Sequence, residues 1–67
     1  MMGQNWMRAR RKELGISQED LAILADISQT MVSQYETGKV IPRVVTAKRI
    51  AKALKVDWER FYEEGEE

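Results

Sequence analysis

Four uncharged side chains that both donate and accept hydrogen bonds recur between residues 28 and 36. At about 100° per residue, a helix over this stretch carries two opposite arcs: a polar arc of Gln29, Thr30, Ser33 and Gln34, and an apolar arc of Met31, Val32 and Tyr35. A solvated helix face is usually rich in Lys, Glu and Arg, which are good helix formers. Glutamine instead suits the edge of adenine, and the threonine methyl suits the thymine methyl. The composition of the polar arc therefore favours a base-contacting surface over the alternative of an ordinary polar helix surface.

Two short helices joined by a tight turn would position the polar arc. The first is predicted over residues 18–25, because residues 17–20 read Ser-Gln-Glu-Asp and can form a capping box. The second is predicted over residues 28–36, with Ser28 as its N-cap. Asp26 lies in the turn, where it tolerates a left-handed backbone better than most residues. The sequence thus predicts two consecutive helices, with the polar arc on the second.

This segment resembles the helix-turn-helix of the phage repressor and Cro family, also called the Xre family. The resemblance covers about residues 5–62, and it rests on the following matching positions: Arg11, Leu14-Gly15, Gln18, Leu21-Ala22, Ile27-Ser28, Val32-Ser33, Glu36, Gly38, Pro42, Ile50-Ala51, Ala53-Leu54 and Val56. It implies an all-α, lambda-repressor-like domain of five short helices around one core. It also implies sequence-specific binding of double-stranded DNA, with the second helix of the pair in the major groove.

The resemblance assigns roles to individual residues. It implies base contacts from the polar arc, in which Gln29, Thr30 and Gln34 match the base-reading positions and Ser33 lies between them. It implies phosphate contacts from Gln18, Ser28, Lys39 and Arg43. The place of Gln18 in the first turn of a helix agrees with such a contact, because the backbone N–H groups there favour a phosphate.

A structural ion pair between Arg11 and Glu36 is also implied by the resemblance. Arg11 lies on the apolar stripe of a predicted first helix over residues 4–13, together with Met7 and Leu14. An unpaired charge on a core face is costly. This cost favours the pair over the alternative of two free surface charges.

The remaining elements follow from the apolar pattern. Pro42 is expected to open a fourth helix, since proline is favoured at the first helical position, and the buried stripe of that helix is predicted to be Val44, Ala47, Ile50, Ala51 and Leu54. A fifth short helix is predicted over residues 58–63, capped by Asp57. We expect residues 1–67 to form one domain with an ordered core at about 5–62 and an acidic tail at 63–67.

Composition narrows the possible function classes. The chain of 67 residues contains no His and no Cys, which removes the usual nucleophile–base pairs and zinc sites. We therefore expect no enzymatic activity, no metal and no cofactor. The longest apolar run, at residues 21–25, is far shorter than the roughly 20 residues of a membrane span. No signal peptide is evident, so we expect a cytoplasmic protein.

The net charge of zero hides a polarised chain. Residues 1–56 carry ten Lys and Arg against five Asp and Glu, whereas residues 57–67 carry one Arg against six acids. The first part has the basic character typical of nucleic-acid-binding domains. The acidic tail is expected to stay away from a phosphate surface.

Two readings of function remain open. The first is a transcriptional regulator, by family habit a repressor, that binds a two-fold symmetric operator as a homodimer. The second is an antitoxin or adaptor on the same fold, which the neutral total charge and a projecting Ile23 favour. The polar arc, flanked by Lys39 and Arg43, argues for the first. RNA binding is disfavoured, because no solvent-facing aromatic pair suited to base stacking is evident.

A homodimer needs an apolar contact surface. The candidates are Trp58, Tyr62, Ile23 and Leu24, because Tyr and Trp are enriched at interfaces and the two aliphatic residues depart from the polar types common in the family at their positions. The alternative is that Trp58 and Phe61 simply close the core of the monomer. The sequence leaves this choice open.

Overall fold

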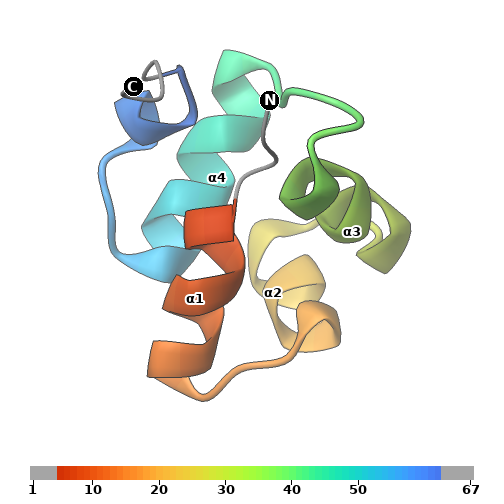
Figure 1. Ribbon diagram of the computed structural model, residues 1–67, viewed down its shortest axis with the longest axis vertical. Coiled ribbons are helices and arrows are strands. Elements are labelled where there is room, and N and C mark those ends of the chain that lie inside the picture. The colour runs from red at the N-terminus through yellow and green to blue at the C-terminus, as the bar shows by residue number, and fades with distance from the viewer. Residues whose placement is uncertain (1–4, 63–67) are drawn as a thin grey trace.

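The computed structural model describes residues 5–62 of the chain, so the acidic tail lies outside the described residues. The elements, in chain order, are α1 (Asn5–Leu14), α2 (Gln18–Ala25), α3 (Gln29–Thr37), α4 (Val44–Leu54) and the 3-10 helix η1 (Trp58–Tyr62) (Figure 1). No strand occurs within residues 5–62. The predicted all-α class is therefore confirmed for the described residues. No described helix is long and apolar enough to cross a membrane.

The fifth element differs from the prediction of an α-helix over residues 58–63. It is a five-residue 3-10 helix, in which the Arg60 N–H donates to the Asp57 carbonyl three residues earlier at 3.2 Å. Such i→i+3 bonding is common in short segments that have no room for several α-helical turns. The count of five α-helices is therefore wrong by one.

Local hydrogen bonds fix the starts of α2 and α3 where the sequence predicts them. The Asp20 N–H donates to Ser17 Oγ, and the Ser17 N–H donates to Asp20 Oδ2, both at 3.0 Å. The Ser28 Oγ accepts the Met31 N–H at 3.1 Å. These bonds satisfy backbone N–H groups that a helix leaves unpaired in its first turn, so both helices begin at defined residues.

The core lies between α4 and the other helices. Its largest fully buried side chains come from all four α-helices: Met7, Leu21, Val32, Ile50 and Leu54. In Figure 1, α1 lies beside the lower part of α4, and α2 and α3 lie on the other side. Trp6 packs edge-on against the buried ring of Phe61, with centroids 4.9 Å apart. This packing joins the first helix to the last element.

The start of α4 also differs from the prediction. Pro42 does not open the helix; it is buried two residues earlier, where its carbonyl accepts the Tyr62 O–H at 2.6 Å. Arg43 is the N-cap and Val44 is the first helical residue. Val44 is 45% exposed, because it lies in the first turn, beyond the reach of the core. The rest of the predicted stripe is buried.

A buried ion pair ties α1 to the helix-turn-helix. Arg11 Nε lies 2.7 Å from Glu36 Oε2, and Arg11 Nη2 donates to Glu36 Oε1 at 3.3 Å. Arg11 Nη1 also donates to the Ile16 carbonyl at 3.1 Å, and Gln18 Nε2 donates to Glu36 Oε1 at 3.0 Å. Arg11 and Glu36 are less than a tenth exposed. The pair thus fixes α1, the start of α2 and the end of α3 relative to one another.

All four α-helices end in a left-handed residue. Gly15 and Gly38 supply this conformation after α1 and α3, whereas Asp26 (φ 60°) and Lys55 (φ 61°) supply it after α2 and α4. The Asp26 turn was predicted from the sequence. The left-handed conformation of Lys55 was not predicted, because lysine adopts it less readily than Asp.

The first prediction concerns these two strained ends. Lys55→Gly should raise the free energy of unfolding by up to about 1 kcal/mol, because an L-residue in the left-handed region costs about 1–2 kcal/mol and glycine returns part of that as chain entropy. Asp26→Gly should give a smaller gain. Urea unfolding measures both. As a control, Lys52→Gly within α4 should lower stability by about 1 kcal/mol; an equal loss for Lys55→Gly would contradict the prediction.

A second prediction concerns the buried ion pair. Arg11→Ala and Glu36→Ala should each cost about 3–5 kcal/mol, because either change strands a buried charge. The double variant should cost much less than the sum of the two. Thermal or urea melts measure the coupling, and the exposed pair Arg10–Glu13 is the control, with an expected coupling of about 0.5 kcal/mol or less. Additive effects of Arg11→Ala and Glu36→Ala would show that the pair is not a unit.

Candidate nucleic-acid interface

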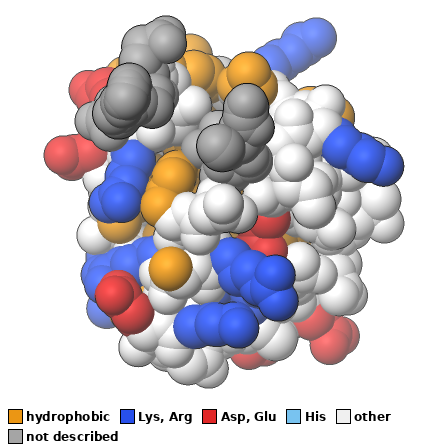
Figure 2. Space-filling model, viewed as in Figure 1, with side chains coloured by type: hydrophobic (Ala, Val, Ile, Leu, Met, Phe, Trp, Pro, Cys, Tyr) orange, Lys and Arg blue, Asp and Glu red, His pale blue; other side chains and the backbone are white. Residues whose placement is uncertain are grey.

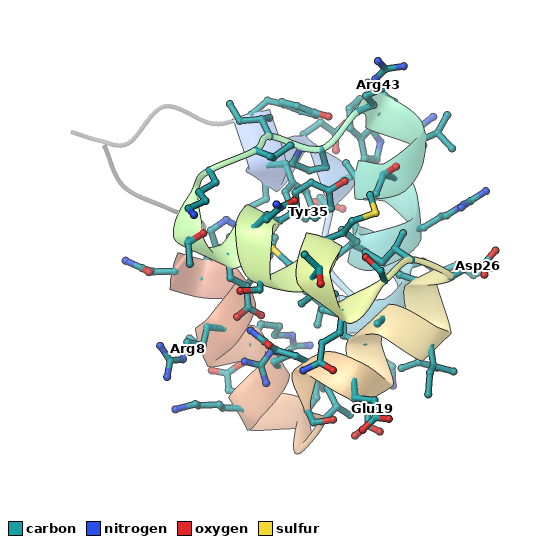
Figure 3. All side chains as sticks on the ribbon, turned by 90° about the vertical axis from the view of Figure 1, so that its right-hand side faces the viewer. Arg8, Glu19, Asp26, Tyr35 and Arg43 are labelled. Carbon is teal, nitrogen blue, oxygen red and sulfur yellow. The ribbon has the colours of Figure 1, made fainter. Side chains whose placement is uncertain are left out.

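The polar arc lies on the outer side of α3, and its members differ in exposure. Gln29 and Thr30 are exposed at the start of the helix, whereas Ser33 and Gln34 are half-buried. The apolar arc behaves as predicted: Val32 and Tyr35 are buried, and Met31 is half-buried against the core. The helix therefore presents hydrogen-bonding side chains outward and is held by its apolar side (Figure 3).

The structure adds a residue to this face that the sequence reasoning missed. α3 continues to Thr37 rather than ending at residue 36, and Thr37 is exposed. Residues 29, 33 and 37 are four apart, so they lie on one side of a helix. Extending the helical period by one residue would have found Thr37. Its Oγ1 donates to the Gln34 carbonyl at 3.2 Å.

An open polar cleft of about 470 Å³ lies between the start of α1 and this side of α3. Its lining residues come from α1, α2 and α3: Asn5, Arg8, Arg11, Gln18, Ser33, Glu36 and Thr37. The buried ion pair is therefore the inner wall of the cleft, and Arg8 lies at its rim, with its side chain directed away from the ribbon (Figure 3). Ser33 faces this cleft. Asn5 is a second residue that the sequence reasoning did not identify.

The side chains of Gln18 and Ser28 each form a hydrogen bond within the protein. The Gln18 side chain uses its amide nitrogen on Glu36, which braces α2 against the end of α3. The Ser28 hydroxyl oxygen accepts a cap hydrogen bond. Both residues lie at helix N-termini, where backbone N–H groups and the helix dipole favour an anion. Their capacity for a phosphate therefore comes from the backbone as much as from the side chain.

Exposed cations lie beyond the C-terminal end of α3. Lys39 follows directly after the helix cap at Gly38, and Arg43 is the N-cap of α4. The Arg43 side chain projects from the upper edge of the face in Figure 3. These two residues and Arg8 thus supply positive charge around the polar arc.

Arg10 serves the fold. Arg10 donates from Nε to the Leu54 carbonyl at 2.9 Å and pairs with Glu13 at 3.0 Å. Figure 2 shows Lys and Arg side chains gathered over the part of its face where α1 and the end of α4 lie, while the side of α3 is mostly uncharged. The α3 surface is therefore uncharged and hydrogen-bonding within a basic domain.

The four predicted dimer contacts lie in different surroundings. Ile23 and Leu24 are 72% and 61% exposed on α2. Trp58 is half-buried against the core, with the Lys48 ammonium 5.2 Å from its ring centroid. Tyr62 is 40% exposed, and its hydroxyl is bonded to the Pro42 carbonyl.

A second exposed apolar group was missed by the sequence reasoning. It consists of Val40, Ile41, Val44 and Val45, which lie between the end of α3 and the first turn of α4. The prediction that Val44 is a core residue concealed this group. A short apolar run before a helix has the same residue types whether it is buried or exposed.

The described residues show no metal-binding group. Residues 5–62 contain no group of three or more His, Cys, Asp or Glu that could hold a metal ion. What the arrangement provides is a hydrogen-bonding helix face, two helix N-termini and flanking cations. Such a surface suits a polyanion that also presents donors and acceptors.

Comparisons with known proteins agree with this arrangement. A model of the helix-turn-helix family matches residues 7–61. The chain is 33% identical over 63 residues to an uncharacterized HTH-type transcriptional regulator, YqaF, of Bacillus subtilis (strain 168), covering 94% of this chain and 83% of that protein.

Two solved structures have the same fold. The P22 c2 repressor, solved in complex with the synthetic operator 9T, superposes with a TM-score of 0.83 at 28% identity, over 91% of this chain and 92% of that one. The restriction-modification controller protein C.AhdI from Aeromonas hydrophila gives a TM-score of 0.79 at 28% identity, over 87% and 88% of the two chains. The chain therefore belongs to the helix-turn-helix family of DNA-binding transcriptional regulators, of the phage repressor and Cro type.

Proposed function

We propose that this protein binds a two-fold symmetric DNA operator as a homodimer, reads base pairs with α3 in the major groove, and represses transcription in the cytoplasm. It performs no chemistry. Occupancy of an operator near a promoter would exclude the polymerase by steric overlap. In this proposal residues 1–67 act as one DNA-binding domain, and no cofactor or metal takes part.

The observation that carries the proposal is the character of the exposed face of α3. Its side chains are short, uncharged and hydrogen-bonding, and Gln and Thr are suited to adenine and thymine in the major groove. A helix selected only for solubility would carry Lys and Glu there. The likeness to a repressor solved on its operator supports the same role for α3.

Phosphate contacts would anchor the domain on both sides of α3. Lys39 and Arg43 lie beyond one end of the helix, and Arg8 lies at the rim of the cleft on its other side. The N-termini of α2 and α3, at Gln18 and Ser28, add backbone N–H groups. Such contacts set the register of α3 in the groove without reading sequence themselves.

Two copies are needed for specificity. A single module of this size covers only about 600–1,000 Å² of protein surface on DNA, and few side chains of α3 can reach base edges. Two copies on half-sites about one helical turn apart would double these contacts.

An antitoxin or adaptor role is the second candidate. It is favoured by Ile23 and Leu24, which are 72% and 61% exposed on the helix that precedes the turn. A partner protein that covers these residues would leave α3 open. The two roles are therefore compatible in one protein.

The operator itself is the first test. Selection from a random duplex library at physiological salt should enrich a two-fold symmetric site, because two identical subunits read identical half-sites. Enrichment of no sequence at all would overturn the proposal.

The third prediction separates base reading from anchoring. Gln34→Ala should cost about 1–3 kcal/mol per half-site and relax the preference at one base position. Lys39→Ala should weaken binding to all sequences alike and reduce the steepness of the salt dependence by about one unit. Fluorescence anisotropy over a salt series measures both.

Lys52→Ala is the control for the loss of one positive charge. Lys52 lies on α4 in a groove with Leu24 and Arg49, and no residue of α3 lines that groove. It should leave the slope of the salt dependence unchanged. An unchanged affinity and sequence preference for Gln34→Ala would show that Gln34 does not read a base.

A further inference from the structure

A hydrogen bond ties the last described residue of the chain to the connection between α3 and α4. The Tyr62 hydroxyl donates to the Pro42 carbonyl at 2.6 Å, across 20 residues of sequence. Pro42 is buried, and the bond itself is partly buried. We call residues 38–43 the α3–α4 connection. Since the hydroxyl proton is used within the protein, it holds this connection and is not free to be donated to a ligand.

The α3–α4 connection carries the two cations that the proposed function uses beyond the end of α3. They are Lys39 near its start and Arg43 at its end. Lys39 is held by α3 itself, because its backbone N–H donates to the Gln34 carbonyl at 3.0 Å. This bond belongs to the cap of the helix and does not involve Tyr62. The backbone at the two cations is therefore fixed by different means.

The path of the chain at Arg43 depends on the peptide group that precedes it. The ring of Pro42 fixes its φ at about −65°, and a peptide group is planar. The direction of the Pro42 carbonyl therefore also sets the direction in which Arg43 follows. On its other side Arg43 is held by α4, because the Ala47 N–H donates to the Arg43 carbonyl at 2.8 Å. The Tyr62 hydroxyl thus completes the support of the Arg43 backbone.

The donor of this hydrogen bond is itself held by the core. Phe61, the residue before Tyr62, is 3% exposed and packs edge-on with Trp6 at a centroid distance of 4.9 Å. The Trp58 ring packs edge-on against Tyr62 with centroids 6.1 Å apart, and the Lys48 ammonium lies 5.2 Å from the Trp58 ring centroid. The bond therefore ties the α3–α4 connection to a fixed part of the molecule.

We propose that Tyr62 is a positioning residue for DNA binding, whose hydroxyl holds the backbone at Arg43 so that the exposed guanidinium is presented to a phosphate. The proposal rests on the proposed function, since that function assigns the phosphate contact to Arg43. Figure 3 shows the Arg43 side chain at the upper edge of the α3 face. Preorganised groups lose less conformational freedom on binding. A tethered backbone therefore makes this contact stronger than the same arginine on an untethered connection would.

A purely structural role is the alternative, and the two roles differ in their effect on Arg43. If the hydrogen bond only stabilised the fold, its loss would lower the melting temperature and leave each phosphate contact of the folded protein unchanged. If the bond positions Arg43, its loss weakens that contact in the folded protein, while Lys39 is unaffected because α3 holds it. The two cations of the α3–α4 connection thus provide a test and its internal control.

The fourth prediction concerns Tyr62→Phe, which keeps the ring and removes only the hydroxyl. Its affinity for a duplex with one half-site should fall about threefold to tenfold, because ordering one long side chain at an interface has a cost of this size. The slope of the salt dependence should become shallower, since phosphate is contacted less completely. The preferred sequence should stay the same, because α3 is unchanged. Fluorescence anisotropy over a salt series measures the affinity and the slope, and a single half-site removes the effect of a second bound copy.

A double-mutant cycle identifies the cation through which Tyr62 acts. The loss of affinity caused by Arg43→Ala should be at least about twofold smaller in the Tyr62→Phe background than in the wild type, whereas Lys39→Ala should cause the same loss in both. Val56→Ala is the control for lost stability, because Val56 is half-buried against the core at the other end of α4. It should lower the melting temperature, measured by circular dichroism, without changing the affinity or the salt slope.

The outcomes separate this proposal from the proposed function. Equal losses for Arg43→Ala in both backgrounds would overturn the positioning role, and so would an unchanged affinity for Tyr62→Phe. On a duplex of unselected sequence the same coupling is expected, because phosphate contacts do not read sequence. If the wild type prefers no sequence but Tyr62 and Arg43 remain coupled there, base reading fails and the positioning role stands. If the wild type prefers a sequence and the two residues are not coupled, the function stands and the positioning role fails.

Discussion

The arrangement of the DNA-binding helix pair depends on one buried charge pair. Arg11 and Glu36 are separated by 25 residues in sequence, yet their side chains meet at 2.7 Å. The same carboxylate holds Gln18, so three helices are fixed at a single group. Burial makes this arrangement specific, because the loss of either partner would leave the other charge buried and unpaired. The ion pair thereby adds a directional contact to the apolar packing of α1 and α2 against α3.

Much of the fold could be predicted because the signals are local. The capping residues at Ser17 and Ser28 mark the starts of two helices, and the apolar period marks their buried sides. The ion pair needed the family resemblance, since no local pattern links residues so far apart in sequence. The predictions failed at element ends. Thr37, Pro42 and Val44 each lie within two residues of a helix boundary, where a shift of one position changes which side of the helix a residue occupies.

Candidate surfaces for protein–protein contact were harder to predict than the candidate base-reading surface. The polar arc has an unusual composition for a helix surface, so its residue types alone indicate a ligand. An exposed valine or isoleucine carries no such signal, because the same residue is the commonest choice for a core. Only the structure shows that Val45 and Ile41 lie outside the core while Ile50 and Leu54 lie inside it. Exposure of apolar residues is a property of the assembled fold.

The exposure of Gln29 and Thr30 has a consequence for how the protein can change. Neither side chain contributes to the core, and the cap that starts their helix belongs to Ser28. The residues at these two positions can therefore be exchanged with little cost to folding. In the proposed function these two positions read bases, so a lineage of such proteins could acquire new target sites by drift at two surface positions, and an engineer could retarget the scaffold by the same route without rebuilding its interior.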